Sequence, residues 1–361
     1  MIVSAQEDFS FPLAEAARKQ IFYRARTYQQ EGDQASILII TPNLEDEFEQ
    51  DGINIQLTTR NGLYRKRWLL RESDRVEYWG TTGLIALKIG MLSRAGNKRL
   101  IVTDGGVVST GARASLRKLA ASRLTSFYDE IDVFTEYQRK LLLKMLPKGY
   151  HRRINKIKPV VEPVSLPKVE RAADPTILYM GHLSRFKGVD LLLKLFEDLL
   201  PEQPKLRLIL CHNGLTYDEE CERDVKELAR RFPEQVIVKG KVDPYEQLAR
   251  AHILIHPIKQ SEGTFAFPMA LWEAVVTGTP FISTRLDGVA EFFDDSFLSP
   301  VDDYLSLMSL TRGMLMELEK YRSLLNKNHE RLVDQVMQCE VEEALGQPTG
   351  EPGFRNGNGK F

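Results

Sequence analysis

Two glutamates are set around an almost entirely apolar stretch of the chain. Residues 261 to 280 read SEGTFAFPMALWEAVVTGTP, with Glu262 near the start and Glu273 further along. Proline is favoured in the first turn of a helix and glycine just past its end, so Pro268 and Gly278 predict a short helix between them. The free N–H groups at the start of such a helix attract anions, and a carboxylate on the helix can accept hydrogen bonds from paired hydroxyls.

A second loop, GHLSRFKGVD, supplies cations. It follows an apolar, strand-like stretch and contains Gly181, which permits close approach of the backbone to a ligand, together with Arg185 and Lys187. In open parallel sheets ligands bind beyond the carboxyl ends of the strands, where both loops are expected. A lysine near a helix N-terminus predicts a diphosphate site, with Glu273 on the hydroxyls of a ribose. Taken alone, either residue also suits a surface position on its helix.

These loops belong to a repeated alternation of strands and helices. The first half alternates apolar runs such as IVSA and SILIITP with helix-like segments, and the alternation restarts at TILYMGHL after the proline-rich segment KIKPVVEPVSLPKVE. Such alternation predicts parallel sheets covered by helices on both faces. We therefore expect an α/β fold with two Rossmann-like, doubly wound parallel-sheet domains that face a ligand cleft.

The domain limits follow from the same patterns. A chain of 361 residues divides more naturally into two domains than one. We expect an N-terminal Rossmann-like domain at residues 1–163 and a C-terminal one at 164–335. Helical spacing over residues 306 to 345 predicts that helix continues into 336–346, a C-terminal helix that could pack back on the N-terminal domain. Residues 347–361 are rich in glycine, proline and asparagine and predict a flexible tail.

Three segments together resemble a known family. ILYMGHLSRFKGVDLLL, EGTFAFPMALWEAVVTGTPFIST and DGVAEFF occur in this order and are similar to motifs of the retaining glycosyltransferases of family 4, the glycosyl transferases group 1. The resemblance extends over about residues 176 to 295. It implies the GT-B architecture of two Rossmann-like domains. It also implies transfer of a sugar from a nucleotide diphosphate sugar, with retained configuration, in polysaccharide or glycolipid assembly.

The resemblance also assigns roles to residues. It implies that Lys187 binds the donor diphosphate, Glu273 the ribose hydroxyls and Glu262 the sugar, so Lys187 and Glu262 are the expected catalytic residues. It implies no cofactor and no metal, because cationic side chains and the helix N-terminus stabilise the departing diphosphate. The expected donor-binding residues are Gly181, His182, Arg185, Lys187, Glu262, Gly263, Thr264, Phe265, Ala266, Phe267 and Glu273.

The sequence departs from the family pattern at three places. His182 occupies the position of an arginine, Glu262 and Glu273 are eleven positions apart where the family has eight, and EDFSFPLAEAARK lacks the glycines of the family's first loop. Two alternatives therefore stay open. One is a non-catalytic partner subunit of an active transferase, and the other is a sugar-phosphate synthase or phosphorylase of the same architecture.

Charge is unevenly divided along the chain. Residues 1–168 hold 27 Lys and Arg against 19 Asp and Glu, whereas the remainder hold 22 against 31. This suggests an anionic partner for the first half. Bases beside aromatic residues suit an anionic membrane surface, although burial of Trp68 with Leu69 and Leu70 is the alternative. The expected membrane contacts are Arg65, Lys66, Arg67, Trp68, Arg117 and Lys118.

Further expectations concern the acceptor and the location of the protein. Asp104, Gly105 and Gly106 follow a strand-like run and are candidate contacts to a glycan or lipid-linked acceptor, with an ordinary turn as the alternative. No stretch approaches the roughly 20 apolar residues of a membrane span, and the start of the sequence does not read as a signal peptide. Three scattered cysteines suit a reducing compartment. We expect a cytoplasmic protein, peripheral on the inner membrane face, with a protein partner in a glycan-assembly complex and no nucleic-acid partner.

Overall fold

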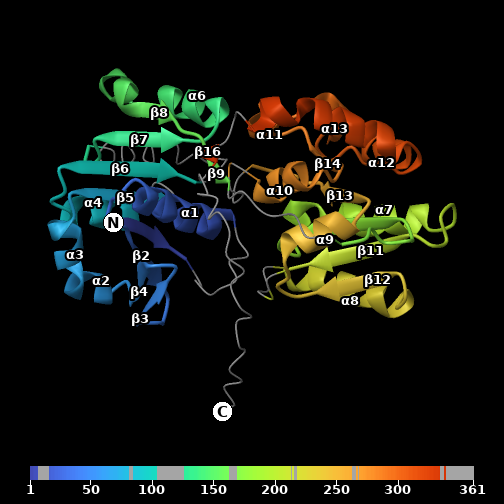
Figure 1. Ribbon diagram of the computed structural model, residues 1–361, viewed down its shortest axis with the longest axis horizontal. Coiled ribbons are helices and arrows are strands. Elements are labelled where there is room, and N and C mark those ends of the chain that lie inside the picture. Colours follow the sequence, from blue (N-terminus) through green and yellow to red (C-terminus); the bar gives the residue numbers. More distant parts are fainter. Residues whose placement is uncertain are drawn as a thin grey trace, which may run out of the picture.

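The computed structural model contains two α/β domains side by side (Figure 1). The described residues are 1–6, 16–80, 84–103, 126–161, 169–212, 214, 218–261, 266, 268–333 and 337–338. Each domain is built on one predominantly parallel sheet. The predicted fold class is therefore confirmed.

The sheet of the N-terminal domain has, in the described residues, eight strands in the order β3-β4-β2-β1-β5-β6-β7-β8. All neighbouring strands are parallel except β3 and β4. The strands are β1 Ile2–Ala5, β2 Ser36–Thr41, β3 Asp46–Gln50, β4 Ile53–Thr59, β5 Arg75–Gly80, β6 Asn97–Val102, β7 Glu130–Val133 and β8 Ile154–Lys156. The helices are α1 Ala16–Gln30, α2 Gly62–Arg65, α3 Arg67–Glu72, α4 Leu84–Leu92, α6 Glu136–Met145 and the 3-10 helix η1 Lys148–Arg153.

Helices cover both faces of this sheet. Phe22 of α1 belongs to the same buried cluster as Ile37 and Ile39 of β2. Leu38 of β2 points the other way, because successive strand side chains alternate between faces, and packs in a second cluster with Ala86 of α4. Strands buried on both faces explain why the sequence shows them as continuous apolar runs.

The antiparallel hairpin of β3 and β4 was not among the expected elements. Its turn contains Asp51 and Gly52, both with positive φ, at 51° and 75°. Two consecutive left-handed residues are typical of the tight turns of hairpins, for which an Asp-Gly pair is a sequence signal. The signal was present in the sequence, and the hairpin places β3 at one edge of the sheet.

The C-terminal domain has, where the chain is described, a fully parallel six-stranded sheet in the order β12-β11-β10-β13-β14-β15. The strands are β10 Thr176–Met180, β11 Arg207–Cys211, β12 Val236–Lys239, β13 Ile253–His256, β14 Phe281–Thr284 and β15 Leu298–Ser299. The helices are α7 Val189–Leu199, α8 Glu219–Arg231, α9 Pro244–Arg250, α10 Met269–Thr277, α11 Asp287–Ala290, α12 Tyr304–Met316 and α13 Leu318–Val333, with the 3-10 helices η2 Arg185–Lys187 and η3 Asp295–Phe297.

The end of the chain corrects one expectation. Helix was expected over residues 306 to 345, and the structure forms two helices up to Val333, since α12 ends at Met316 and α13 begins at Leu318. Met337–Gln338 forms a short strand, β16, that pairs with β9 (Val160–Val161) between the two domains. Backbone pairing with β9 replaces helix there. The rest of 336–346, the tail 347–361 and the expected domain boundary at residue 163 lie outside the described residues.

A cap joins the two domains. Thr135 and Gln138 form a capping box at the start of α6. Glu291, which follows α11 in the other domain, accepts hydrogen bonds from the backbone N–H groups of Glu136 and Tyr137 at 2.7 and 2.5 Å. Its carboxylate also lies 3.2 Å from Lys156 Nζ. A carboxylate is stabilised at a helix N-terminus by the free N–H groups and the helix dipole, so DGVAEFF is a contact between domains.

Gly188 fixes the turn that leads into α7. Its φ is 75°, and a Cβ there would lie 1.9 Å from the carbonyl oxygen of Pro257, directly after β13. Only glycine therefore lets the loop after β10 pack against the loop after β13. This contact holds Lys187, the preceding residue, at the carboxyl ends of both strands.

We predict that Gly188→Ala destabilises the C-terminal domain by about 3 kcal/mol or more, because the substitution adds a clash to a left-handed backbone. Urea denaturation monitored by circular dichroism would measure the loss. Gly240→Ala is the matched control, since a Cβ there meets no atom within 4 Å. Equal stability of the two variants would contradict this reading of the turn.

Candidate active site

The candidate site lies where the carboxyl ends of β10 and β13 meet the start of α10. Gly181 directly follows β10, and a Cβ at this position would lie 3.0 Å from Tyr179 Oη and 3.5 Å from His256 Nε2. Helix α10 starts at Met269, with Pro268 as its N-cap and Gly278 left-handed at its end. The helix predicted from Pro268 and Gly278 is thus formed within one residue of the expected limits.

Lys187 is buried in this loop. Its ammonium group lies 5.4 Å from the centre of the Phe186 ring, a cation–π contact. Lys187 is also close enough to His256 to lower the pKa of that histidine. The structure therefore excludes the surface position that was the alternative for this lysine.

His256 is a neutral group at the bottom of the site. The side chain is buried, its Nδ1 has no hydrogen-bond partner, and its ring lies 5.9 Å from that of Tyr179. Burial, together with the nearby charges of Lys187 and His182, lowers the pKa of His256 to about 3. Tyr179 in turn donates a 2.6 Å hydrogen bond to the carbonyl oxygen of His182. Sequence reasoning treated His256 as structural, and nothing local in the sequence signals its place beside Lys187.

Arg185 points toward α8 in this structure. Its guanidinium forms ion pairs with Glu220 at 3.0 Å and Asp224 at 3.2 Å, and its side chain is largely exposed. A donor phosphate would have to compete with both carboxylates for this arginine. Its role in donor binding stays a prediction.

Glu273 is buried on α10 and forms an ion pair with Lys19 of α1, in the other domain. The solvent-facing position that was the alternative for Glu273 is therefore wrong. Next to this pair, Gln20 donates a hydrogen bond to Met269 Sδ at 3.1 Å and exchanges two hydrogen bonds with the backbone of Val160. The first turn of α1 thus forms one wall of the site, which sequence reasoning missed.

Several expected residues cannot be placed. Ala266 is buried, and its N–H donates a 2.9 Å hydrogen bond to the carbonyl oxygen of Thr103, which directly follows β6. The loop before α10 therefore contacts the N-terminal domain next to the expected acceptor side. Outside the described residues lie Glu262, Gly263, Thr264, Phe265, Phe267, Asp104, Gly105, Gly106, Arg117 and Lys118.

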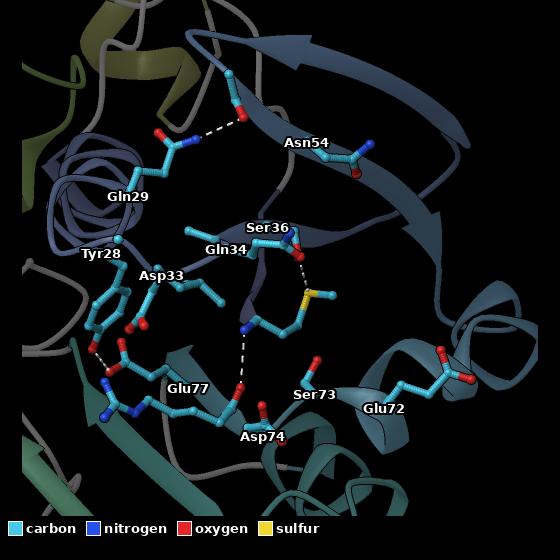
Figure 2. Close-up of a pocket in the computed structure, with 16 residues that line it drawn as sticks. Tyr28, Gln29, Asp33, Gln34, Ser36, Asn54, Glu72, Ser73, Asp74 and Glu77 are labelled. Atoms are coloured by element: carbon cyan, nitrogen blue, oxygen red, sulfur yellow. Dashed lines mark hydrogen bonds between the residues drawn. The ribbon is translucent and has the colours of Figure 1, made fainter.

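A pocket of about 1040 Å³ lies at the amino ends of the strands of the N-terminal sheet (Figure 2). It is lined by the amino ends of β1, β2 and β5, whereas the carboxyl ends face the candidate site. At its edge Tyr28 of α1 donates a hydrogen bond to the buried Glu77 of β5, as Figure 2 shows. Arg24 lies 3.6 Å from the same carboxylate. These contacts anchor α1 on the sheet.

The described parts of the chain hold neither a candidate metal-ion site nor a candidate membrane span. No group of three or more His, Cys, Asp or Glu side chains there could hold a metal ion. None of the helices in those parts is both long enough and apolar enough to span a bilayer.

Comparisons with known proteins agree with the fold. Residues 174–315 match the family described as Glycosyl transferases group 1. The phosphatidylinositol N-acetylglucosaminyltransferase gpi3 subunit of Schizosaccharomyces pombe is 24% identical over 195 residues, which cover 45% of this chain and 41% of that protein. The match thus spans less than half the length of this relative.

Solved structures are similar over nearly the whole chain. Anabaena HepE, in complex with UDP and glucose, has a TM-score of 0.74 at 14% identity, covering 93% of this chain and 95% of that one. WaaG, a glycosyltransferase involved in lipopolysaccharide biosynthesis, has a TM-score of 0.64 at 16% identity, covering 92% and 95%. The trehalose-6-phosphate synthase OtsA has 0.71 at 10%, covering 92% and 95%. These similarities show that the fold is GT-B.

The low pKa of His256 predicts a pH effect on stability. Between pH 6.5 and about 3 the unfolded histidine takes up a proton that the folded one refuses, so stability falls as the pH drops through this range. From pH 7 to pH 5 the contribution is about 2 kcal/mol. His256→Leu should remove it, so the variant should lose about 2 kcal/mol less than the wild type over this interval in urea denaturation. Equal losses in both proteins would show that His256 is not a buried neutral group.

Proposed function

We propose that the chain transfers a sugar from a nucleoside diphosphate sugar to a glycan or lipid-linked acceptor, with retained configuration. Two observations support the proposal: Lys187, in the loop between β10 and α7, is buried, and Glu273 is buried on α10, where it pairs with Lys19 of the other domain. A buried lysine, a helix N-terminus and a buried carboxylate further along that helix are suited to a ligand that has both phosphates and hydroxyls.

The proposed chemistry uses these groups without a metal. Lys187 and the free N–H groups at the start of α10 stabilise the negative charge that develops on the departing diphosphate. Glu273 accepts hydrogen bonds from the ribose hydroxyls. His256 stays neutral at physiological pH, so it lends no charge to this step. The acceptor hydroxyl attacks on the face that the diphosphate leaves, which retains the configuration. The bond from the sugar to the diphosphate breaks as the new glycosidic bond forms, and the departing diphosphate takes the proton of the hydroxyl, so the step requires no dedicated protein base.

Uridine diphosphate sugars are the first donors to test, because the similar HepE was solved with UDP and glucose. Lipid-linked acceptors fit the description of the curated relative as a phosphatidylinositol N-acetylglucosaminyltransferase subunit. That relative is named as a subunit, which also favours a protein partner. A place on the inner membrane face stays a prediction.

The second candidate is a non-catalytic partner subunit. His182 in place of an arginine and the glycine-free stretch before α1 favour it. The pairing of Glu273 with Lys19 points the same way, since the carboxylate is already engaged. A sugar-phosphate synthase is the other enzymatic alternative, in view of the similarity to OtsA.

The donor site is tested by calorimetric titration of UDP, GDP, ADP and dTDP with and without a chelator, followed by hydrolysis of the matching sugar nucleotides. We expect chelator-resistant binding of one nucleotide. Lys187→Ala and Glu273→Ala should each weaken it about 10- to 100-fold, the effect of losing a charge-assisted hydrogen bond. Lys226→Ala, at an exposed lysine of the same domain, is the control. Binding without turnover would favour the non-catalytic subunit, and no binding would contradict the proposal.

A membrane-facing surface is the second part of the proposal. Helices α2, α3 and α4 lie on the outer side of the N-terminal domain (Figure 1). Trp68 is 51% exposed, and Tyr64, Leu84 and Met91 are also exposed, so burial of Trp68 is wrong, although Leu70 is buried. Lys88 of α4 lies 5.5 Å from the Tyr64 ring centre, so bases and aromatic rings share this face. Such a mixture suits the interface of an anionic bilayer.

We predict that the triple change Arg65→Gln, Lys66→Gln and Arg67→Gln weakens binding to vesicles containing phosphatidylglycerol about 100-fold, since each base contributes about 1 kcal/mol near such a surface. Trp68→Ser should weaken it several-fold. Co-sedimentation measures both effects. Leu305→Ser is the matched control, because Leu305 is an exposed apolar residue of the C-terminal domain. Unchanged binding of both N-domain variants would count against this surface.

A further inference from the structure

Three consecutive polar residues are buried in the first two turns of α1: Arg18, Lys19 and Gln20. Polar side chains are seldom buried unless they meet specific partners. Here Gln20 reaches Met269 and Lys19 reaches Glu273, both on α10. The N-terminal domain therefore places an ammonium group on the same carboxylate to which the proposed function assigns the ribose.

Helix α1 holds that ammonium group in a fixed position. Further along the helix, Tyr28 donates a hydrogen bond to the buried carboxylate of Glu77 (Figure 2). Arg24 lies 3.6 Å from the same carboxylate, and Gln29 donates a 2.8 Å hydrogen bond to the carbonyl oxygen of Gly52. The helix is thus attached to the sheet at one end and to α10 at the other. The flexible part is the four-carbon side chain of Lys19 itself.

A ribose on Glu273 must displace this lysine. Its hydroxyls are neutral, so they can replace the hydrogen bond but not the charge that neutralises the carboxylate. Lys19 would then be left as a buried ammonium group without an anion, which is strongly unfavourable. The diphosphate of the same ligand is joined to the ribose, and its negative oxygens can be reached by the flexible side chain of a lysine.

We propose that Lys19 exchanges Glu273 for the donor diphosphate when the nucleotide binds, and so is the cation that the N-terminal domain contributes to the donor site. The inference rests on the proposed function and deepens it. It accounts for the glycine-free stretch before α1, since a side-chain cation takes the place of backbone N–H groups. It also makes binding selective, because only a ligand with both hydroxyls and phosphates satisfies Glu273 and Lys19 together.

The test compares uridine with UDP, by calorimetry, in the wild type, Lys19→Gln and Lys19→Arg. Glutamine still donates a hydrogen bond to Glu273 but has no charge, whereas arginine keeps the charge. We expect Lys19→Gln to lower UDP affinity about 10- to 30-fold and to leave uridine binding unchanged or tighter, so the preference for UDP over uridine falls at least about 10-fold. Lys19→Arg should keep that preference within about threefold of the wild type.

The outcomes separate the two levels of the proposal. Uridine and UDP both bound more tightly by the same factor in Lys19→Gln would mean that Lys19 only competes for Glu273, and would overturn this inference alone. Failure of the wild type to bind any of the four nucleoside diphosphates would overturn the proposed function and this inference with it. Thermal denaturation checks folding, and the doubly neutral Lys19→Gln, Glu273→Gln variant shows whether a destabilised fold stems from an unpaired carboxylate.

Discussion

The ion pair between Lys19 and Glu273 is the contact on which the arrangement of the site depends. It joins helices α1 and α10 of different domains, and its two residues are 254 positions apart in the chain. A buried ion pair gains little net stability, because both charges lose their hydration, but removal of one partner leaves an unfavourable buried charge. The pair therefore contributes little to stability but restricts which ligands can bind. A ligand that binds Glu273 must also offer an anionic group to the ammonium group of Lys19.

Several other contacts between the domains are polar, although buried apolar side chains of both domains also belong to one cluster. Glu291 caps α6, the N–H of Ala266 donates to Thr103, and Gln20 donates to Met269 Sδ. Each of these hydrogen bonds can be exchanged for one with water at modest net free energy, unlike an apolar core. The aromatic cluster of Trp272, Phe292 and Phe293 lies within the C-terminal domain and keeps α10 rigid there.

Much of the fold could be predicted from the sequence. Apolar runs that alternate with helical spacing predicted both parallel sheets, and Pro268 and Gly278 predicted α10 to within one residue. Two elements were not predicted, one because its turn signal was overlooked and the other because a tertiary contact overruled the local pattern. The Asp51-Gly52 turn was a readable sign of the β3–β4 hairpin. Met337–Gln338, by contrast, lies in a stretch with helical spacing and becomes a strand only because β9 offers a pairing edge.

The sequence by itself determined the fold class and the loops at the carboxyl ends of the strands. The signals behind both, which are hydrophobic periodicity and the backbone preferences of proline and glycine, extend over only a few residues. It also determined that Gly188 precedes α7, although not why glycine is needed, which is the carbonyl oxygen of Pro257. Only the tertiary structure decided which charges meet: Lys187 beside His256, Lys19 on Glu273 and Glu291 at α6. Pairings between residues so distant in the chain arise from the packing of whole domains, and no local pattern records them.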